Sequence, residues 1–295
     1  MAKDSRWNKI RKILVTVLIL NLLVAVLKLV FGRIVNSHSM VADGFHSFSD
    51  GASNIVGLVG IWYASFPIDK DHPYGHKKYE TFASIVIAIL LFIVSFYILH
   101  ESFARMLNPV LPKINFISFI VMLSTMAINF GVMRYEHNQG LRLKSDVLTS
   151  DAMHTQADML TSLSVIAAFI FIKLGYPIFD TLFALLIATF VGHAGLEILR
   201  ASSQVLCDQA VLDPKVIKKI CLSVEGVLQC HKIRTRGRQD AIHVDLHALL
   251  NGETTLKKAH QISYAIEDSI KKGIPGIADV IIHIEPESDQ YNNKG

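Results

Sequence analysis

Long apolar segments constrain this chain more than any other feature of its sequence. Six stretches are predominantly apolar, at residues 13–31, 40–66, 82–103, 114–133, 147–174 and 178–199. About 20 apolar residues in a helix cross the hydrocarbon core of a bilayer, so each stretch is long enough to span. The composition agrees, because 51% of the 295 residues are hydrophobic and only 18% are charged, whereas a soluble domain has about 25% charged residues. We therefore expect six transmembrane helices in a lipid bilayer.

Basic residues divide unevenly between the two sides of these segments. The N-terminus and the connections on its side hold eleven Lys and Arg residues, and the opposite connections hold four. The excess predicts that both termini face the cytoplasm, as six spans require, in the cell (inner) membrane. The first apolar run is too long for a signal peptide and has no small-residue cleavage site, so we expect a retained helix. A net charge of +4 is too small and dispersed to indicate nucleic-acid binding.

The chain changes character after the sixth apolar segment. Helical patterns begin near residue 213 and at residues 254–272, and strand patterns occupy residues 227–235, 241–249 and 279–285. This α-β-β-α-β order predicts a small ferredoxin-like α+β domain in the cytosol. We therefore divide the chain into a transmembrane domain at 1–207, a cytosolic domain at 208–287 and a disordered tail at 288–295. The three cysteines form no C-x-x-C pair and predict no disulfide framework.

Two of the apolar segments carry the same polar pattern, although carboxylates are costly inside a bilayer. Residues spaced i, i+3 and i+7 lie on one face of a helix. The second segment has this spacing at Asp43, His46 and Asp50, and the fifth at Asp151, His154 and Asp158. Each residue alone could hydrogen-bond to a neighbouring helix. The repetition favours a shared metal site between the two helices.

The H-x-x-x-D parts of the two patterns supply the ligands of this predicted transport site: His46, Asp50, His154 and Asp158. Two imidazoles and two carboxylates suit tetrahedral Zn²⁺ and also accommodate Fe²⁺, Mn²⁺, Co²⁺ or Cd²⁺. A ligating histidine must be neutral, so metal and protons compete for the site. That competition is the physical basis of proton-coupled antiport. The aspartates one turn earlier, Asp43 and Asp151, either line the access path and support the ligands or cap helix ends.

Two further groups of potential ligands lie outside the apolar segments. The connection after the second segment contains Asp69, His72 and His76, which one turn and a helix start could present to one ion; the alternative is a solvated loop. In the last third, the predicted strand 241–249 places His243, Asp245 and His247 on one face. Histidines exposed on a surface, without a metal, are the alternative there.

Nearly the whole chain resembles the cation diffusion facilitator (CDF) family. The resemblance rests on residues 39–50, 69–76 and 151–158, which contain patterns described above, and on residues 280–283. It implies six membrane helices, metal held between the second and fifth helices, a cytosolic C-terminal domain and a homodimer. It also implies export of divalent metal from the cytoplasm against an inward proton flux. The His/Asp ligand set is similar to that of zinc-transporting members, whereas manganese-type members tend to replace the histidines with Asp or Asn.

The same resemblance implies metals bound in the cytosolic domain. The matching positions are His231, Asp245, His260, His283 and Glu285. Asp245 stands where the family commonly has a histidine, and His243 or His247 could change the register of the site. By the same resemblance, Lys78 and Asp208 match a charge pair that ties the two domains together; the alternative is two unrelated interfacial charges.

We therefore predict a homodimeric, proton-coupled exporter of Zn²⁺ or a similar divalent ion, regulated by cytosolic metal. A metal-responsive interaction or scaffold protein that does not transport is the alternative, although the intact ligand set argues against it. An intramembrane metallohydrolase is disfavoured because no H-E-x-x-H is present and four ligands leave no position for a water. The chain is thus predicted not to be an enzyme.

Overall fold

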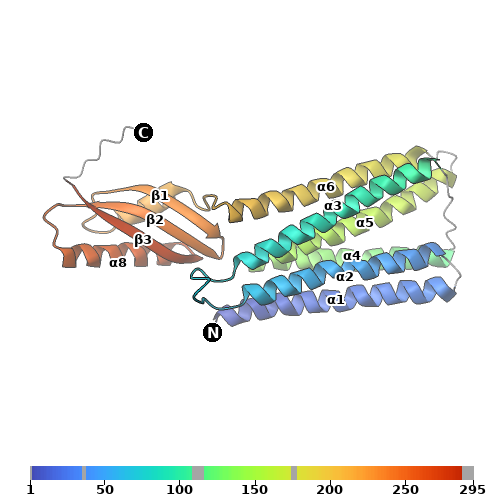
Figure 1. Ribbon diagram of the computed structural model, residues 1–295, viewed down its shortest axis with the longest axis horizontal. Coiled ribbons are helices and arrows are strands. Elements are labelled where there is room, and N and C mark those ends of the chain that lie inside the picture. The colour runs from blue at the N-terminus through green and yellow to red at the C-terminus, as the bar shows by residue number, and fades with distance from the viewer. Residues whose placement is uncertain (1, 35–37, 108–115, 174–177, 288–295) are drawn as a thin grey trace. The chain divides into compact units, whose positions relative to one another are not determined.

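A computed structural model describes residues 2–34, 38–107, 116–173 and 178–287, with only the backbone described at some helical positions. The chain divides into two compact units, Met1–Ser202 and Ser203–Gly295. Within the described residues, the first unit is a bundle of long helices (Figure 1). These helices are α1 (Ala2–Ile34), α2 (His38–Ala64), α3 (Lys78–Leu107), α4 (Phe116–Leu143), α5 (Asp146–Lys173) and α6 (Ile178–Leu206). Six helices were predicted for this part, and six are found.

Three of these helices are long and apolar enough to cross a membrane by length and composition alone. The stretches that meet this criterion in the described residues are Arg6–Phe31, Lys78–His100 and Leu182–Leu206. In α2 a shorter stretch, Gly51–Ala64, is apolar. Helices α2 and α5 carry the two predicted His/Asp patterns, whose polar residues lower the mean hydropathy.

Helix α2 packs closely against both α3 and α5, because two of its glycines lack a side chain. A Cβ on Gly60 would lie 2.3 Å from the Cβ of Ala83 on α3. A Cβ on Gly57 would lie 2.8 Å from Cγ1 of Val147 on α5. Real Cβ contacts are not this short, so the glycines permit the spacing that brings α2 and α5 together.

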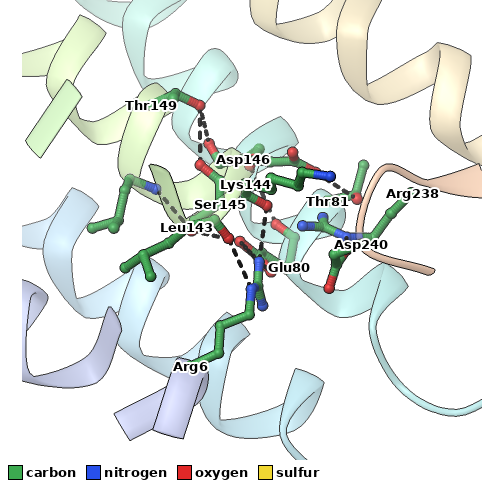
Figure 2. Close-up of polar contacts among 12 residues, drawn as sticks. Arg6, Glu80, Thr81, Leu143, Lys144, Ser145, Asp146, Thr149, Arg238 and Asp240 are labelled. Carbon is green, nitrogen blue, oxygen red and sulfur yellow. Dashed lines mark hydrogen bonds and ion pairs between the residues drawn. The ribbon is translucent and has the colours of Figure 1, made fainter. Parts of the chain in front are cut away.

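A buried ion pair ties together the end of the bundle at which α1 and α3 begin (Figure 2). Glu80 on α3 is fully buried. One of its oxygens accepts from Nη2 of Arg6 at 3.1 Å, and the other accepts from Oγ of Ser145 at 2.5 Å. Arg6 also donates to the carbonyls of Leu143 and Lys144, each at 2.9 Å. This Arg6–Glu80 clasp therefore holds the α4–α5 turn against α1 and α3.

The second unit is an α+β domain with the predicted order of elements. The elements are α7 (Pro214–Leu222), β1 (Gln229–Arg238), β2 (Ala241–Leu250), α8 (Leu256–Gly273) and β3 (Ile277–Pro286). The sheet order is β1-β2-β3, with β1 antiparallel and β3 parallel to the central β2. Helix α7 begins as expected, because Asp213 accepts from the backbone N–H of Lys215 at 2.9 Å and Pro214 is the first helical residue.

The core of this domain lies between one face of the sheet and the two helices. Alternate residues of β2 are buried there: Ile242, Val244, Leu246, Ala248 and Leu250. They pack with an apolar stripe of α8 that repeats every three or four residues, at Ala259, Ile262, Ile266 and Ile270. Because side chains alternate along a strand, the other residues of β2 point to the opposite, partly exposed face. That face carries the histidines of β2, His243 and His247.

Candidate metal centres

The α5 part of the predicted transport site is buried. His154 is 4% exposed, and the side chain of Asp158 is 11% exposed. They stand one turn apart, with Nε2 of His154 3.8 Å from Oδ2 of Asp158. Nδ1 of His154 is buried and has no hydrogen-bond partner among the described residues. An imidazole and a carboxylate this close, with a ring nitrogen left unsatisfied, are suited to receive a cation.

The α2 part of the site is described only as backbone. Asp43, His46 and Asp50 all lie within α2, but their side chains fall outside the described residues. Helix α2 does pack against α5 through Gly57. Closure of four ligands around one ion therefore stays a prediction.

The connection between α2 and α3 forms a compact cluster of three ligands. The ligand atoms of Asp69, His72 and His76 all lie within 4.8 Å of one another. One oxygen of Asp69 is 3.1 Å from Nδ1 of His72, and the other is 3.3 Å from Nε2 of His76. The backbone N–H of His72 donates to Asp69 and, with the histidine side chains, holds the pKa of that carboxyl below its usual range.

The tautomer of His76 favours a cation in this loop cluster. Its Nδ1 is 3.0 Å from the carbonyl oxygen of Pro67, which can only accept, so Nδ1 carries the proton. In the neutral ring, Nε2 then has a lone pair that faces the carboxylate of Asp69. Two acceptors in this arrangement need a proton or a metal between them. Since His76 is only 6% exposed, water does little to satisfy that lone pair.

A second three-ligand cluster lies on the exposed face of the sheet, one residue from each strand. His231 on β1 and His247 on β2 are register partners, and Glu285 lies on β3. Oε2 of Glu285 is 3.0 Å from Nε2 of His231, and Oε1 is 2.6 Å from Nδ1 of His247. The hydrogen bond with His247, and the charges of both histidines, lower the pKa of Glu285. His283 borders the cluster, with its ring centroid 4.6 Å from that of His247.

The other histidines and acids predicted for this domain lie apart from the cluster. Asp245 is 3.6 Å from Nη2 of Arg234, with which it forms an ion pair. His260 is on the exposed side of α8, against the ring of Tyr264. Because α8 covers the opposite face of the sheet, His260 does not reach the cluster within one chain. The half-buried His243 is two residues before Asp245 on β2.

The predicted interdomain charge pair involves residues of different units. Lys78 is the first residue of α3. Asp208 follows the end of α6 and has a positive φ of 54°, a conformation typical of the residue after a helix. Their pairing stays a prediction.

Sequence reasoning missed a buried polar network that connects four helices. Asn21 on α1 donates to Oδ1 of Asn54 on α2 at 2.9 Å, and Asn54 donates to Oδ2 of Asp151 on α5. On α4, Glu136 is fully buried, and its carboxyl group lies within interaction distance of Asp151. The predicted fourth segment ended at residue 133, so Glu136 was assigned to a connection, whereas α4 continues to Leu143. Its spacing of seven from the inward-facing Asn129 is the signal that would have found it.

The buried His154 and Asp158 in a helical bundle, together with two clusters that could hold a metal ion, fit a membrane protein that handles metal cations. Residues 14–207 match the family model described as the cation efflux transmembrane domain, and residues 212–287 match the cation efflux protein cytoplasmic domain. The chain therefore belongs to the cation diffusion facilitator family. It is an integral membrane protein of a transporter family and not an enzyme, and the predicted fold class is confirmed.

Several relatives match over most of their length. The uncharacterized transporter MJ0449 of Methanocaldococcus jannaschii is 27% identical over 282 residues, covering 94% of this chain and 99% of that protein. The manganese efflux system protein MneP of Bacillus subtilis is 29% identical over 287 residues, covering 94% and 96%. The cation-efflux pump FieF of Shewanella oneidensis is 28% identical over 252 residues, covering 85% of each chain.

Proposed function

We propose that this protein exports Zn²⁺ from the cytoplasm in exchange for protons. The observation that carries the proposal is the buried pair of His154 and Asp158 on α5, in a chain of a cation efflux family. His46 and Asp50 on the adjacent α2 would complete four ligands. Two imidazoles and two carboxylates match the preference of Zn²⁺ for a tetrahedral set of nitrogen and oxygen donors.

Proton coupling follows from the chemistry of the same ligands. His154 binds metal only when its ring is neutral, so the arrival of a metal ion displaces a proton. Protonation from the other side of the membrane weakens the site and releases the ion. In alternating access, the site would open to one side of the membrane at a time.

The identity of the metal is the part of the proposal that most needs a direct test. A relative is named as a manganese efflux protein, so Mn²⁺ is the main competitor. We suggest counterflow of Zn²⁺, Mn²⁺, Fe²⁺ and Cd²⁺ in proteoliposomes, with the parent chain and with His46→Asp. The parent should prefer Zn²⁺, and His46→Asp should shift the preference toward Mn²⁺, a harder ion that prefers oxygen ligands. Counterflow of none of these metals by the parent would refute the proposed function.

The orientation that we propose places both termini, and therefore the loop cluster and the second unit, in the cytoplasm of the inner membrane. The unequal distribution of basic residues supports it. In this orientation the cluster of Asp69, His72 and His76 would bind metal at the face from which the ion enters. Asp43 and Asp151, one turn before the histidines of the transport site, would lie along the access path.

We further propose that the protein works as a homodimer whose cytosolic domain, residues 208–287, senses metal. The match to the family's cytoplasmic domain supports a shared role for this part. His231, His247 and Glu285 fit a divalent ion, because both histidines already converge on the carboxylate. His283 and, from the partner subunit, a residue such as His260 would add ligands to this cluster. Lys78 and Asp208 would link the domain to the membrane helices.

A further inference from the structure

Two buried carboxyl groups face each other between α4 and α5. Glu136 is fully buried, and Asp151 is 1% exposed. The two carboxyl groups are within interaction distance. Neither oxygen of Glu136 has a hydrogen-bond donor among the described residues, and Oδ1 of Asp151 has none. Two ionised carboxylates in this position would repel each other.

The groups that surround this carboxyl pair are mostly uncharged. From α2, Asn54 donates to the other oxygen of Asp151, and Ser53 is also at hydrogen-bonding distance. Helix α1 contributes Asn21, which donates to Asn54. Along α5, His154 is the titratable group whose charge acts on Asp151.

Among the described residues, Asp151 is the one charged group that acts on Glu136. The buried Lys28 of α1 donates to Ser47 of α2. Two charged residues of α3 lie at this end of the bundle: Glu80 is paired with Arg6, and Lys78 is the first residue of the helix. A lysine or arginine is therefore not what neutralises the pair. A proton is the smallest cation that can do so, and it needs no further ligands.

The position of the pair is along the path between one end of the bundle and the transport ligands. Asp151 is five residues after the first residue of α5, or about 7.5 Å along the axis at 1.5 Å per residue. His154 is one turn further in. On α4, Asn129 shares the face of Glu136, and its buried Oδ1 has no partner among the described residues. The carboxyl pair is thus continuous with a polar stripe that extends deeper into the bundle.

We propose that Glu136 and Asp151 form a proton-binding site distinct from the metal ligands, in which one protonated carboxyl group donates its hydrogen bond to the other. Loss of this proton to water leaves two buried carboxylates, so its departure becomes favourable when a divalent cation arrives nearby. The claim that this proton is exchanged during transport rests on the proposed antiport. The claim that the carboxyl pair binds a proton is independent of the proposed antiport. The site gives the chain a proton carrier besides the histidines.

Infrared spectroscopy of the full chain in nanodiscs, without metal and near neutral pH, tests the site directly. A protonated carboxyl group has a C=O stretching band that shifts in deuterium oxide. We expect this band in the parent, its loss in Glu136→Gln and in Asp151→Asn, and no change in the control Glu197→Gln. Glu197 is an exposed residue of α6 that pairs with His193. Absence of the band in the parent, or its persistence at full amplitude in both variants, would overturn the proposal.

Zinc flux separates a failure of this site from a failure of the proposed function. In Glu136→Gln the amide can still donate to Asp151, so the helices stay packed but no proton can leave. We expect Zn²⁺ to bind more weakly than in the parent, because the variant cannot release a proton in exchange, and proton-driven Zn²⁺ flux to fall about tenfold, a typical size for coupled sites. If the parent moves no Zn²⁺, the proposed function fails and the infrared result still stands. The pair would bind metal and not a proton if Glu136→Gln transported Zn²⁺ as fast as the parent but bound one Zn²⁺ fewer per chain. That result would overturn the proposal.

Discussion

The candidate ligands on α5 and those on the exposed face of the sheet use the same residue types in opposite settings. His154 and Asp158 are buried and 3.8 Å apart, and Nδ1 of His154 is unsatisfied within the described structure. His247 and Glu285 are partly exposed and already paired at 2.6 Å. A cluster that satisfies itself persists without metal, and water screens its charges. A buried imidazole with an unsatisfied nitrogen gains more from a cation, as the proposed uptake and release of a substrate would require.

The largest effect should follow from removal of a buried ligand. Asp158→Asn keeps the shape of the side chain but removes its charge. Loss of residues that only support ligands costs about 10- to 100-fold in affinity or activity, so loss of this ligand should reduce Zn²⁺ flux in proteoliposomes by at least about 100-fold. Asp268→Asn, on the exposed surface of α8, is the matched control and should transport normally. Parental flux in Asp158→Asn would show that α5 does not hold the substrate.

The contrast between interior and surface also applies to ion pairs. Glu80→Gln leaves Arg6 without its counter-charge at a buried site and should lower the free energy of unfolding by about 3 kcal/mol. Glu197→Gln breaks the exposed pair with His193 and should have almost no effect. Thermal unfolding in detergent measures both. Equal stability of the two variants would mean that the Arg6–Glu80 clasp does not hold the bundle together.

Close helix packing makes the interior sensitive to a single methyl group. In Gly60→Ala the new Cβ would lie 2.3 Å from that of Ala83, so α2 and α3 must separate. Overpacking of this kind costs about 1–3 kcal/mol. Gly131→Ala on α4 is the control, since no atom lies within 4 Å of its Cβ position. It should be neutral or slightly stabilising in the same thermal unfolding experiment, because alanine favours helices.

Removal of a ligand on the sheet should change metal binding without abolishing transport. His247→Ala removes one of three ligands from the cluster and should weaken Zn²⁺ binding there by about tenfold or more. Isothermal titration of the full chain should show loss of one class of sites, while the maximal Zn²⁺ flux remains within a few-fold of the parent. A loss of flux as large as in Asp158→Asn would remove the distinction between the two sites.

The smallest predicted effect is a dependence of stability on pH. The pKa of Glu285 is below its ordinary value because His247 and His231 stabilise the carboxylate. This contribution to stability is therefore present above the ordinary pKa of about 4.3 and is lost as the pH falls below it. The midpoint temperature of thermal unfolding of the parent should fall in that acidic range. In Glu285→Gln the midpoint should fall less over the same range. Identical acid dependence in both proteins would contradict it.

The sequence predicted the periodic features well, because periodicity follows directly from helix and strand geometry. The order of elements in the second unit and the start of a helix near residue 213 were predicted and found. Which histidines meet was harder to predict. His247, rather than Asp245, converges on Glu285, because pairing across three strands depends on register and on a bulge between His231 and Arg234.

Contacts between helices were outside the reach of sequence reasoning. Nothing local connects Arg6 with Glu80, which are separated by 74 positions, or Glu136 with Asp151. Glu80 and Glu136 lie near helix ends, where a charged residue is ordinarily solvated. Only the packing of the bundle shows that they are buried and which groups face them.

Simultaneous recording of Zn²⁺ and proton movement in proteoliposomes tests the central claim most directly. A zinc-sensitive dye and a pH-sensitive dye inside the vesicles would follow both ions after a Zn²⁺ gradient is applied. Entry of Zn²⁺ should drive protons outward in the parent, and both signals should disappear together in His154→Ala. Zinc entry that leaves the internal pH unchanged, or that survives in His154→Ala, would contradict proton exchange at this site.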